Sequence, residues 1–359
     1  MAAPLSIVDL DLVLAQTQEL WEEMRGQSVF ITGGTGFFGC WLVESFRHVN
    51  RALELGARAT VLTRDPARFA LKAPHLAGDP AITLHAGDVR DFEFPAGEFR
   101  FVIHAATEAS AKQSAEEPME MLSTILAGTE RTLKFAAQCG ARKLLLTSSG
   151  AVYGRQPGDM THVPESYDGA PDPLNAASVY AEGKRAAELM CAVYQKSAEA
   201  KGVEFEAKIA RCWAFCGPHL PLDAHFAIGN FIGDVLAGRS ISIAGDGTPR
   251  RSYLYAADLA VWLWTILFRA PSLLAINVGS ARDVSIRELA ECVTATLAPE
   301  TNIQVAKQAV PGAVPERYVP SVERVEMLLG LRETVGLEDA IRRTAEWHGY
   351  RAAELQRGA

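Results

Sequence analysis

The stretch from Ser28 to Trp41 constrains the fold of this chain more than any other. It reads SVFITGGTGFFGCW, a short apolar run followed by a glycine-rich turn and the start of an amphipathic pattern. A strand, a tight turn and a helix in this order form the first half of a βαβ unit. Gly33 suits the turn, Gly36 lets the backbone approach a pyrophosphate, and Gly39 lets the helix lie close to the sheet. Because the free N–H groups of such a helix face phosphates, the stretch predicts a bound dinucleotide.

A second strand is expected from Ala59 to Arg64, where the sequence reads ATVLTR. In NAD-binding folds an Asp or Glu near this strand end accepts a hydrogen bond from the ribose 2′-OH. This chain has Thr63 there, followed by Arg64. A missing carboxylate beside an arginine suits a 2′-phosphate, so the sequence slightly favours NADP(H) over NAD. The alternative is an exposed Arg64 beside an NAD site.

Two further strands supply the rest of the predicted cofactor site. The strand from Ala81 to His85 leads into Asp88, which is placed either to accept from the adenine amino group or to cap a helix. The apolar strand that begins at Phe101 ends in Ala105 and Ala106. Their small side chains leave room for the middle of the cofactor.

The strand Lys143–Ser149 brings hydroxyls to the sheet edge where open α/β folds bind ligands. Tyr180 and Lys184 follow on one face of a later helix, since they are four residues apart. An alcohol that loses hydride needs a base, and a nearby ammonium together with an oxidised nicotinamide ring favours tyrosinate. Tyr180 is therefore the expected base, Ser149 binds the reacting oxygen, and Lys184 also donates to the nicotinamide ribose.

These arguments predict a catalytic set of Ser149, Tyr180 and Lys184. The expected cofactor-binding residues are Gly33, Gly36, Phe37, Phe38, Gly39, Thr63, Arg64, Asp88, Val89, Ala105, Ala106, Tyr180 and Lys184.

Composition limits the remaining function classes. A net charge of −8 and 48% hydrophobic residues indicate a globular chain and favour neither nucleic acid nor a membrane surface as a partner. The six cysteines lie mostly among apolar residues without a zinc spacing, so we expect reduced thiols, no metal and a cytoplasmic location. The segment from Leu5 to Met24 has mostly helical spacing and is expected to pack on the domain edge.

Taken together, the motifs resemble those of the extended short-chain dehydrogenase/reductases, and among them the nucleotide-sugar epimerase/dehydratase family. The resemblance covers almost the whole chain. The matching residues are TGGTGFFG from Thr32, Gly87-Asp88-Val89, His104-Ala105-Ala106, TSSGAVYG from Thr147, Tyr180 with Lys184, Arg211 through Pro218, Asn230-Phe231-Ile232, GDGTPRRSYLYAADLA from Gly245, Asn277-Val278-Gly279 and Glu316-Arg317-Tyr318.

The resemblance implies a Rossmann-like, doubly wound parallel sheet with a smaller C-terminal α/β substrate domain. The implied boundaries are 1–25 for an N-terminal helical extension, 26–212 with about 252–278 for dinucleotide binding, and 213–251 with 279–359 for the substrate. It also implies a nucleoside diphosphate sugar as substrate, held by Asn230, Arg251 and Arg317, and a homodimer formed through helices flanking the sheet. Two guanidinium groups suit a pyrophosphate, and Arg250 is then the solvated neighbour.

The reaction is suggested by departures from the family pattern. Gly150 and Ala151 stand where related dehydratases carry an Asp-Glu pair, and related decarboxylases keep a glutamate at the second position. Hydride transfer at the sugar 4-position without further acids fits a 4-epimerase, then an NADPH-dependent 4-keto-sugar reductase, then a 4,6-dehydratase or decarboxylase. A non-catalytic NADP(H)-binding regulator fits least, because the catalytic set is complete. Ile125 and Ala214 replace frequent asparagines, which indicates an altered sugar pocket.

Overall fold

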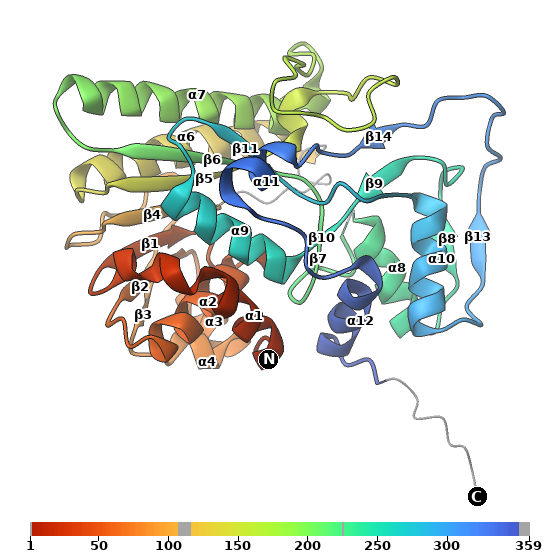
Figure 1. The fold of residues 1–359 in the computed structure, drawn as a ribbon, viewed down its shortest axis with the longest axis horizontal. Helices are drawn as coiled ribbons and strands as arrows, with labels where there is room; N and C mark the ends of the chain where they lie inside the picture. Colours follow the sequence, from red (N-terminus) through yellow and green to blue (C-terminus); the bar gives the residue numbers. More distant parts are fainter. Residues whose placement is uncertain (1, 107–115, 225, 352–359) are drawn as a thin grey trace, which may run out of the picture.

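A seven-stranded parallel sheet forms the centre of the molecule (Figure 1). The computed structural model describes residues 2–106, 116–224 and 226–351. Parts of the three expected domains, residues 1, 107–115, 225 and 352–359, lie outside the described residues. From edge to edge the sheet has the order β11-β6-β5-β4-β1-β2-β3. The strand bounds are β1 (Ser28–Thr32), β2 (Arg58–Thr63), β3 (Ile82–Ala86), β4 (Phe101–His104), β5 (Lys143–Ser149), β6 (Glu206–Cys212) and β11 (Ala275–Val278).

The strand order reverses beside β1, which pairs with β2 on one side and with β4 on the other. Connections that leave in opposite directions open a crevice at the carboxyl ends of the two central strands. This is the doubly wound, Rossmann-like sheet that the sequence predicts, so the predicted fold class is confirmed.

Long helices cover both faces of the sheet. Because side chains alternate along a strand, Val29 and Ile31 of β1 join the core under α2 and α9, whereas Phe30 joins the core under α6 and α7. Every position of α9 except Arg269 is buried. The helix bounds are α2 (Phe37–Ala52), α6 (Pro118–Gln138), α7 (Val179–Ala200) and α9 (Ala256–Arg269).

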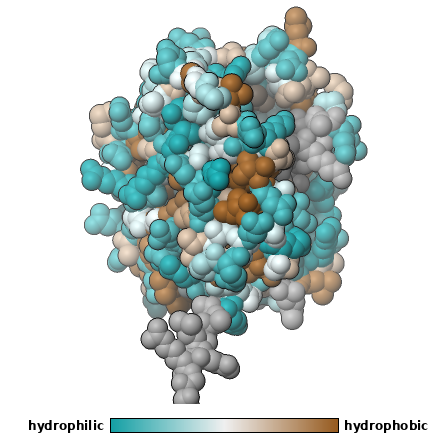
Figure 2. Space-filling model, turned by 90° about the vertical axis from the view of Figure 1, so that its right-hand side faces the viewer, coloured by the Kyte–Doolittle hydropathy of each residue, from teal (hydrophilic) through white to brown (hydrophobic). Residues whose placement is uncertain are grey.

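A smaller group of short strands and helices lies beyond the carboxyl ends of the sheet (Figure 1). Its three-stranded sheet has the order β12-β9-β14, and two pairs, β13-β8 and β10-β7, lie beside it. The outer face of this group, with α10 and β13, is largely hydrophilic with small apolar groups between (Figure 2). The bounds are β7 (Phe215–Cys216), α8 (Ala227–Leu236), β8 (Ile241–Ile243), β9 (Arg250–Ser252), β10 (Leu254–Tyr255), β12 (Asp283–Ser285), α10 (Ile286–Leu297), β13 (Ile303–Val305), β14 (Arg317–Tyr318), α11 (Glu323–Leu329) and α12 (Leu337–Trp347).

Short helical segments complete the described chain. Two of them, α3 and α4, follow β2, and a 3₁₀ turn, η2, follows β5 directly. Their bounds are α3 (Pro66–Lys72), α4 (Pro74–Ala77), η2 (Gly150–Tyr153) and η3 (Ala176–Ser178). None of the described helices is long and apolar enough to cross a membrane. All six cysteines are free, and five of them are buried.

The N-terminal segment is a helix, α1 (Ile7–Thr17), followed by a 3₁₀ helix, η1 (Gln18–Met24). The Ser6 side chain caps α1 by accepting from the Val8 N–H. The Asp9 carboxylate is buried and accepts from the Tyr255 hydroxyl at 2.8 Å and from Arg343 Nη1 at 2.6 Å. One carboxylate therefore connects the N-terminal helix to α9 and to α12.

We expect Asp9→Ala to lower the free energy of unfolding by about 2 kcal/mol, because it leaves a buried phenol and a guanidinium without their acceptor. Urea denaturation measures this change. Asp11→Ala on the same helix is the matched control, since the Asp11 side chain is 61% exposed where it meets His48, and should change the value by less than about 0.5 kcal/mol. Equal effects of the two substitutions would contradict the role given to Asp9.

Candidate active site

The glycine-rich turn lies at the switch point between β1 and β4. Gly33 has a φ of +72°, a conformation that suits glycine. A Cβ atom on Gly33 would overlap the Ala105 carbonyl, and one on Gly39 would overlap the Gly33 carbonyl. Among the described residues, a Cβ on Gly36, the residue that precedes helix α2, would meet only the Gly33 oxygen of the same turn, at 3.5 Å. The turn therefore presses against β4 and α2 while its Gly36 side stays open, which fits a dinucleotide pyrophosphate.

Four other predicted cofactor residues surround this turn. Ala105 and Ala106 are partly exposed directly after β4. Phe37 and Phe38 are partly exposed at the start of α2, and the Phe38 ring packs edge-on against Phe215 with centroids 4.9 Å apart. Both rings are partly buried against the hydrophobic core.

The residues predicted to bind the adenosine part of the cofactor lie at the ends of β2 and β3. Thr63 is buried at the end of β2, and Arg64 is exposed directly after it. Asp88 accepts hydrogen bonds from Arg90 Nε at 2.7 Å and from Arg90 Nη2 at 3.0 Å. Arg90 and the more distant Arg64 hold the pKa of the Asp88 carboxyl below its usual range. Val89 is buried and packs against Gly128 of α6, so it is a core residue as well.

Ser149 lies at the end of β5, in register with Cys212 at the end of β6. Its Oγ accepts from the Ala151 N–H at 3.1 Å. The Ser149 side chain also lowers the pKa of both the Tyr180 and the Tyr318 phenol against the opposing effect of burial, so both phenols lie near this serine. The structure therefore places a second phenol, to which the sequence assigned no role, near Ser149 and Tyr180.

Lys184 is 3% exposed and donates from Nζ to the Thr147 carbonyl of β5 at 2.9 Å. Nζ lies 5.8 Å from the centroid of the Tyr180 ring. Burial lowers the pKa of Lys184 to about 8, opposed by Cys212 and Glu188. The ammonium thus ties the first turns of α7 to the strand that carries Ser149.

Among the chain's own groups, burial has the largest effect on the pKa of Tyr180, which the sequence predicted Lys184 and an oxidised nicotinamide ring to lower together. Burial raises the pKa of Tyr180 to about 12, and Ser149 opposes this only partly. Lys184 was expected to lower that pKa, but its charge is bound by the Thr147 carbonyl and is itself disfavoured by burial. A further positive charge is required to bring Tyr180 into the neutral range.

The sequence assigned no role to Trp213 or Tyr318. A Cβ on Gly150 would lie 2.6 Å from the Trp213 ring and 2.8 Å from the Tyr318 hydroxyl. The two rings pack together with centroids 4.4 Å apart. Aromatic groups therefore fill the place where related dehydratases carry an acid, and only the Arg317-Tyr318 motif could have drawn attention to this phenol.

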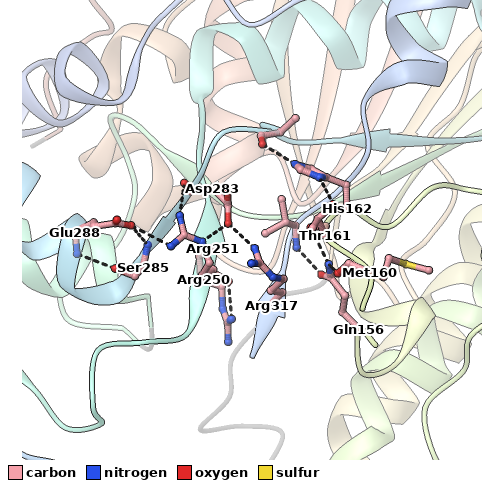
Figure 3. A network of polar contacts seen from close by, with 12 residues as sticks. Gln156, Met160, Thr161, His162, Arg250, Arg251, Asp283, Ser285, Glu288 and Arg317 are labelled. Atoms are coloured by element: carbon pink, nitrogen blue, oxygen red, sulfur yellow. Dashed lines mark hydrogen bonds and ion pairs between the residues drawn. The ribbon is translucent and has the colours of Figure 1, made fainter. Parts of the chain in front are cut away.

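The predicted diphosphate arginines lie on the three-stranded sheet (Figure 3). Arg251 pairs with Glu316 at 2.6 Å, and its guanidinium lies 5.9 Å from the Tyr318 ring centroid. Arg317 Nη1 donates to Asp283 at 2.8 Å. Since Arg317 is in register with Arg250 and Tyr318 with Arg251, the alternation of strand side chains separates Arg251 from Arg317.

Arg250 is not the solvated neighbour that the sequence suggested. It forms ion pairs with Asp283 and Glu288, and its side chain is 25% exposed. It binds these two carboxylates because β12, which carries Asp283, is the strand paired with β9, and α10, which carries Glu288, directly follows β12. Asn230 lies partly exposed in α8, and Ile125, at a frequent asparagine position, packs against Gly183 of α7.

Comparisons with known proteins identify the family of this chain. Residues 29–279 match the model of the NAD-dependent epimerase/dehydratase family. UDP-glucuronic acid decarboxylase 1 of Danio rerio is 29% identical and aligns over 94% of this chain and 75% of its own length. UDP-glucuronic acid decarboxylase 6 of Arabidopsis thaliana is 29% identical over 87% of this chain and 86% of its own length.

Two solved structures show the same fold. The UDP-N-acetylglucosamine 4-epimerase of Methanobrevibacter ruminantium has a TM-score of 0.75 at 22% identity, covering 90% of this chain and 99% of that chain. The UDP-glucose 4-epimerase of Thermus thermophilus, in complex with NAD, has a TM-score of 0.71 at 26% identity, covering 90% and 99%. Since the family model spans most of the chain, and the glycine turn, Ser149, Tyr180 and Lys184 occupy one sheet edge, this protein is an enzyme of the NAD-dependent epimerase/dehydratase family.

Proposed function

We propose that this protein is a 4-epimerase of a nucleoside diphosphate sugar and works by hydride transfer at the sugar 4-position. The observation that carries the proposal is that Ser149, Tyr180 and Lys184 lie together at the end of β5. The residues that follow Ser149, Gly150 and Ala151, supply no acidic group. Oxidation and reduction at one carbon need a single proton acceptor that later returns the proton. With the cofactor bound, hydroxyls and one ammonium are the side-chain groups that this chemistry needs.

Each residue of the catalytic set has a separate role in the proposed hydride transfer. When bound, NAD(P) supplies the hydride acceptor and donor and, in its oxidised form, a positive ring. Tyr180 takes the proton of the 4-hydroxyl as hydride leaves the carbon, and returns it in the reverse step. Ser149 donates to the reacting oxygen, and Lys184 keeps a positive charge within 5.8 Å of the phenol ring. The sugar turns between the two steps, so the hydride returns to the opposite face.

We assign the cofactor to residues 26–212 with about 252–278, and the substrate to 213–251 with 279–359. Within the substrate part, Arg251 is the proposed diphosphate ligand, because it lies beside Tyr318 and its partner Glu316 is 55% exposed and free to move away. Arg317 and Asn230 are the proposed outer contacts. A bound diphosphate would replace the Glu316 carboxylate on Arg251.

Decarboxylation of a nucleoside diphosphate glucuronic acid is the second candidate, supported by the relatives of 28% and 29% identity. It begins with the same oxidation at the 4-position. The glutamate that the resemblance leads us to expect for that reaction is Ala151 here, which is why we place it second. A keto-sugar reductase is the third candidate and requires NADPH.

A panel of UDP-glucose, UDP-N-acetylglucosamine, UDP-glucuronic acid, dTDP-glucose and a 4-keto nucleotide sugar tests these candidates. We expect interconversion of 4-epimers without net change in reduced nicotinamide. Release of carbon dioxide would select the decarboxylase, and net NADPH consumption with a keto sugar would select the reductase. In any of these reactions Tyr180→Phe should lower kcat by about a thousandfold while cofactor affinity changes little.

Tyr194→Phe is the matched control for Tyr180→Phe, since Tyr194 is a phenol on the same helix, more than three turns away. It should retain nearly full turnover. Full turnover in Tyr180→Phe would refute the proposed base.

We propose that NADP(H) is accepted and slightly preferred, because Arg64 is exposed at the end of β2 and Thr63 offers no carboxylate to a ribose 2′-OH. Arg64→Ala should lower NADP+ affinity about tenfold and change NAD+ affinity less than about twofold, since only a 2′-phosphate needs the guanidinium. Fluorescence titration measures both affinities. Arg68→Ala, on the same exposed segment, should leave both unchanged. Equal losses for the two cofactors would contradict the assignment.

We propose a cytoplasmic homodimer formed through α6 and α7, which lie side by side on one face of the sheet (Figure 1). Leu189 and Val193, one turn apart on α7, are 65% and 58% exposed. Leu189→Glu should convert the dimer to a monomer in sedimentation velocity, because it places a charge on an apolar interface. Met327→Glu, at a residue 78% exposed on α11, should leave the dimer intact. A monomeric parent protein would refute this interface.

A further inference from the structure

Helix α7 packs on β5 and β6 and is bound to two successive residues of β5, directly before Ser149 (Figure 1). The Lys184 ammonium donates to the Thr147 carbonyl at 2.9 Å. One helical turn later, the Glu188 carboxylate accepts from the Ser148 hydroxyl at 2.5 Å. The first contact involves a residue of the catalytic set, and the second involves a carboxylate to which the reaction has so far given no role.

The Glu188 carboxylate is held from the neighbouring strand as well. Arg211 of β6 is in register with Ser148. Its guanidinium binds both carboxylate oxygens, with Nε 3.0 Å from Oε1 and Nη2 2.7 Å from Oε2. The side chains of Arg211 and Glu188 are 18% and 16% exposed. Because such a bidentate pair has a fixed geometry, Glu188 joins α7 firmly to two adjacent strands.

The Arg211 guanidinium also contacts the turn that follows Ser149. It lies 4.7 Å from the ring centroid of Tyr153, the last residue of η2. The Tyr153 hydroxyl donates to Asn277 Oδ1 of β11 at 3.0 Å, which holds the ring in place. Ser149 is therefore preceded by Ser148 and followed by Tyr153, and both of these residues contact the same ion pair.

We propose that Glu188 is a positioning residue: it fixes the Lys184 ammonium and the end of β5 in the arrangement that the proposed hydride transfer needs. This inference rests on the proposed function, since the arrangement matters only if Ser149 and Tyr180 perform that transfer. A carboxylate suits the role because it accepts through both oxygens. A glutamine has a single acceptor oxygen, so its NH2 group would face either Ser148 or the guanidinium.

Glu188 also favours the charged form of Lys184. Burial lowers the pKa of Lys184 to about 8, and Cys212 and Glu188 oppose this effect. Burial raises the pKa of the Cys212 thiol to about 12, and that of Cys191 on α7 to about 12, so both thiols are uncharged at neutral pH. His104 of β4 is neutral too, because burial lowers its pKa to about 3. Of these groups, Glu188 is the anion that helps to keep the lysine protonated.

The direct test follows the Lys184 ammonium by NMR during a pH titration of the parent protein and of Glu188→Gln. Both proteins are loaded with NAD+ and carry 13C at the lysine Cε, and Lys184→Arg identifies the resonance. We expect the Lys184 midpoint to fall by about one pH unit in Glu188→Gln, which corresponds to a tenfold weaker preference for the charged amine. An unmoved midpoint would overturn the inference.

Turnover on the active nucleotide sugar of the panel gives the second measurement. The alkaline limb of the pH profile should move down with the Lys184 midpoint, because the ammonium is lost at a lower pH. At pH 7 we expect Glu188→Gln to lower kcat about tenfold while KM changes less than about twofold, since Glu188 acts through Lys184 and β5 and not on the substrate. A change in KM alone would overturn the inference.

A further variant separates the contact with β5 from the charge, and it serves equally if Glu188→Gln does not fold. Ser148→Ala removes the hydroxyl on β5 and leaves the ion pair with Arg211 in place. It should lower kcat about threefold, the effect of one lost hydrogen bond, without moving the Lys184 midpoint. Full turnover in Ser148→Ala would overturn the inference.

Glu199→Gln is the matched control, since it makes the same change at an exposed carboxylate about three turns further along α7. It should leave the Lys184 midpoint and turnover at the values of the parent protein, and effects equal to those of Glu188→Gln would overturn the inference. Tyr180→Phe tests the foundation separately. Full turnover in that variant refutes the proposed base, whereas its inactivity together with a parent-like Glu188→Gln refutes only the role of Glu188.

Discussion

The hydrogen bond from Lys184 to the Thr147 carbonyl is the contact on which the site depends. It joins the beginning of α7 to β5 two residues before Ser149, with 2.9 Å between Lys184 Nζ and the Thr147 carbonyl oxygen. Lys184 is 3% exposed. Because Tyr180 precedes Lys184 by one helical turn, the same contact brings the phenol to the serine. The sheet contributes the other half, since the ends of β1, β4, β5 and β6 lie in a row. The positions of the sheet strands and of α7 thus bring the glycine-rich turn, Ser149 and Tyr180 to one edge of the sheet.

The local parts of this arrangement could be predicted from the sequence. Gly33 and Gly39 fall where a side chain would overlap backbone, and Tyr180 and Lys184 fall on one helical face, so spacing alone identifies both features. The strands follow from short apolar runs, and their bounds in the structure agree to within a few residues. The doubly wound order then follows from alternation of strand and helix.

The parts that could not be predicted depend on contacts between distant segments. Arg250 and Arg251 are adjacent in sequence, yet a strand sends one toward Asp283 and the other toward Tyr318. Two consecutive arginines in a sequence do not indicate which side of the strand each side chain occupies. The pKa of Tyr180 could not be predicted either, because burial is a property of the whole fold and opposes the local effect expected of Lys184. Tyr318 reaches the space beside Gly150 from more than a hundred residues away, so no local spacing reveals it.

Gly150 connects these observations with the reaction. A carboxylate at this position would collide with the Trp213 ring and with the Tyr318 hydroxyl, so the chain cannot regain an acid there without moving β14. A buried carboxylate beside Tyr180 would also raise the pKa of that phenol further, because like charges disfavour a second anion. A neutral phenol in the same space adds no such negative charge. A reaction that needs an acid at this position, as an elimination does for its leaving hydroxyl, would therefore have to take its proton donor from another part of the site.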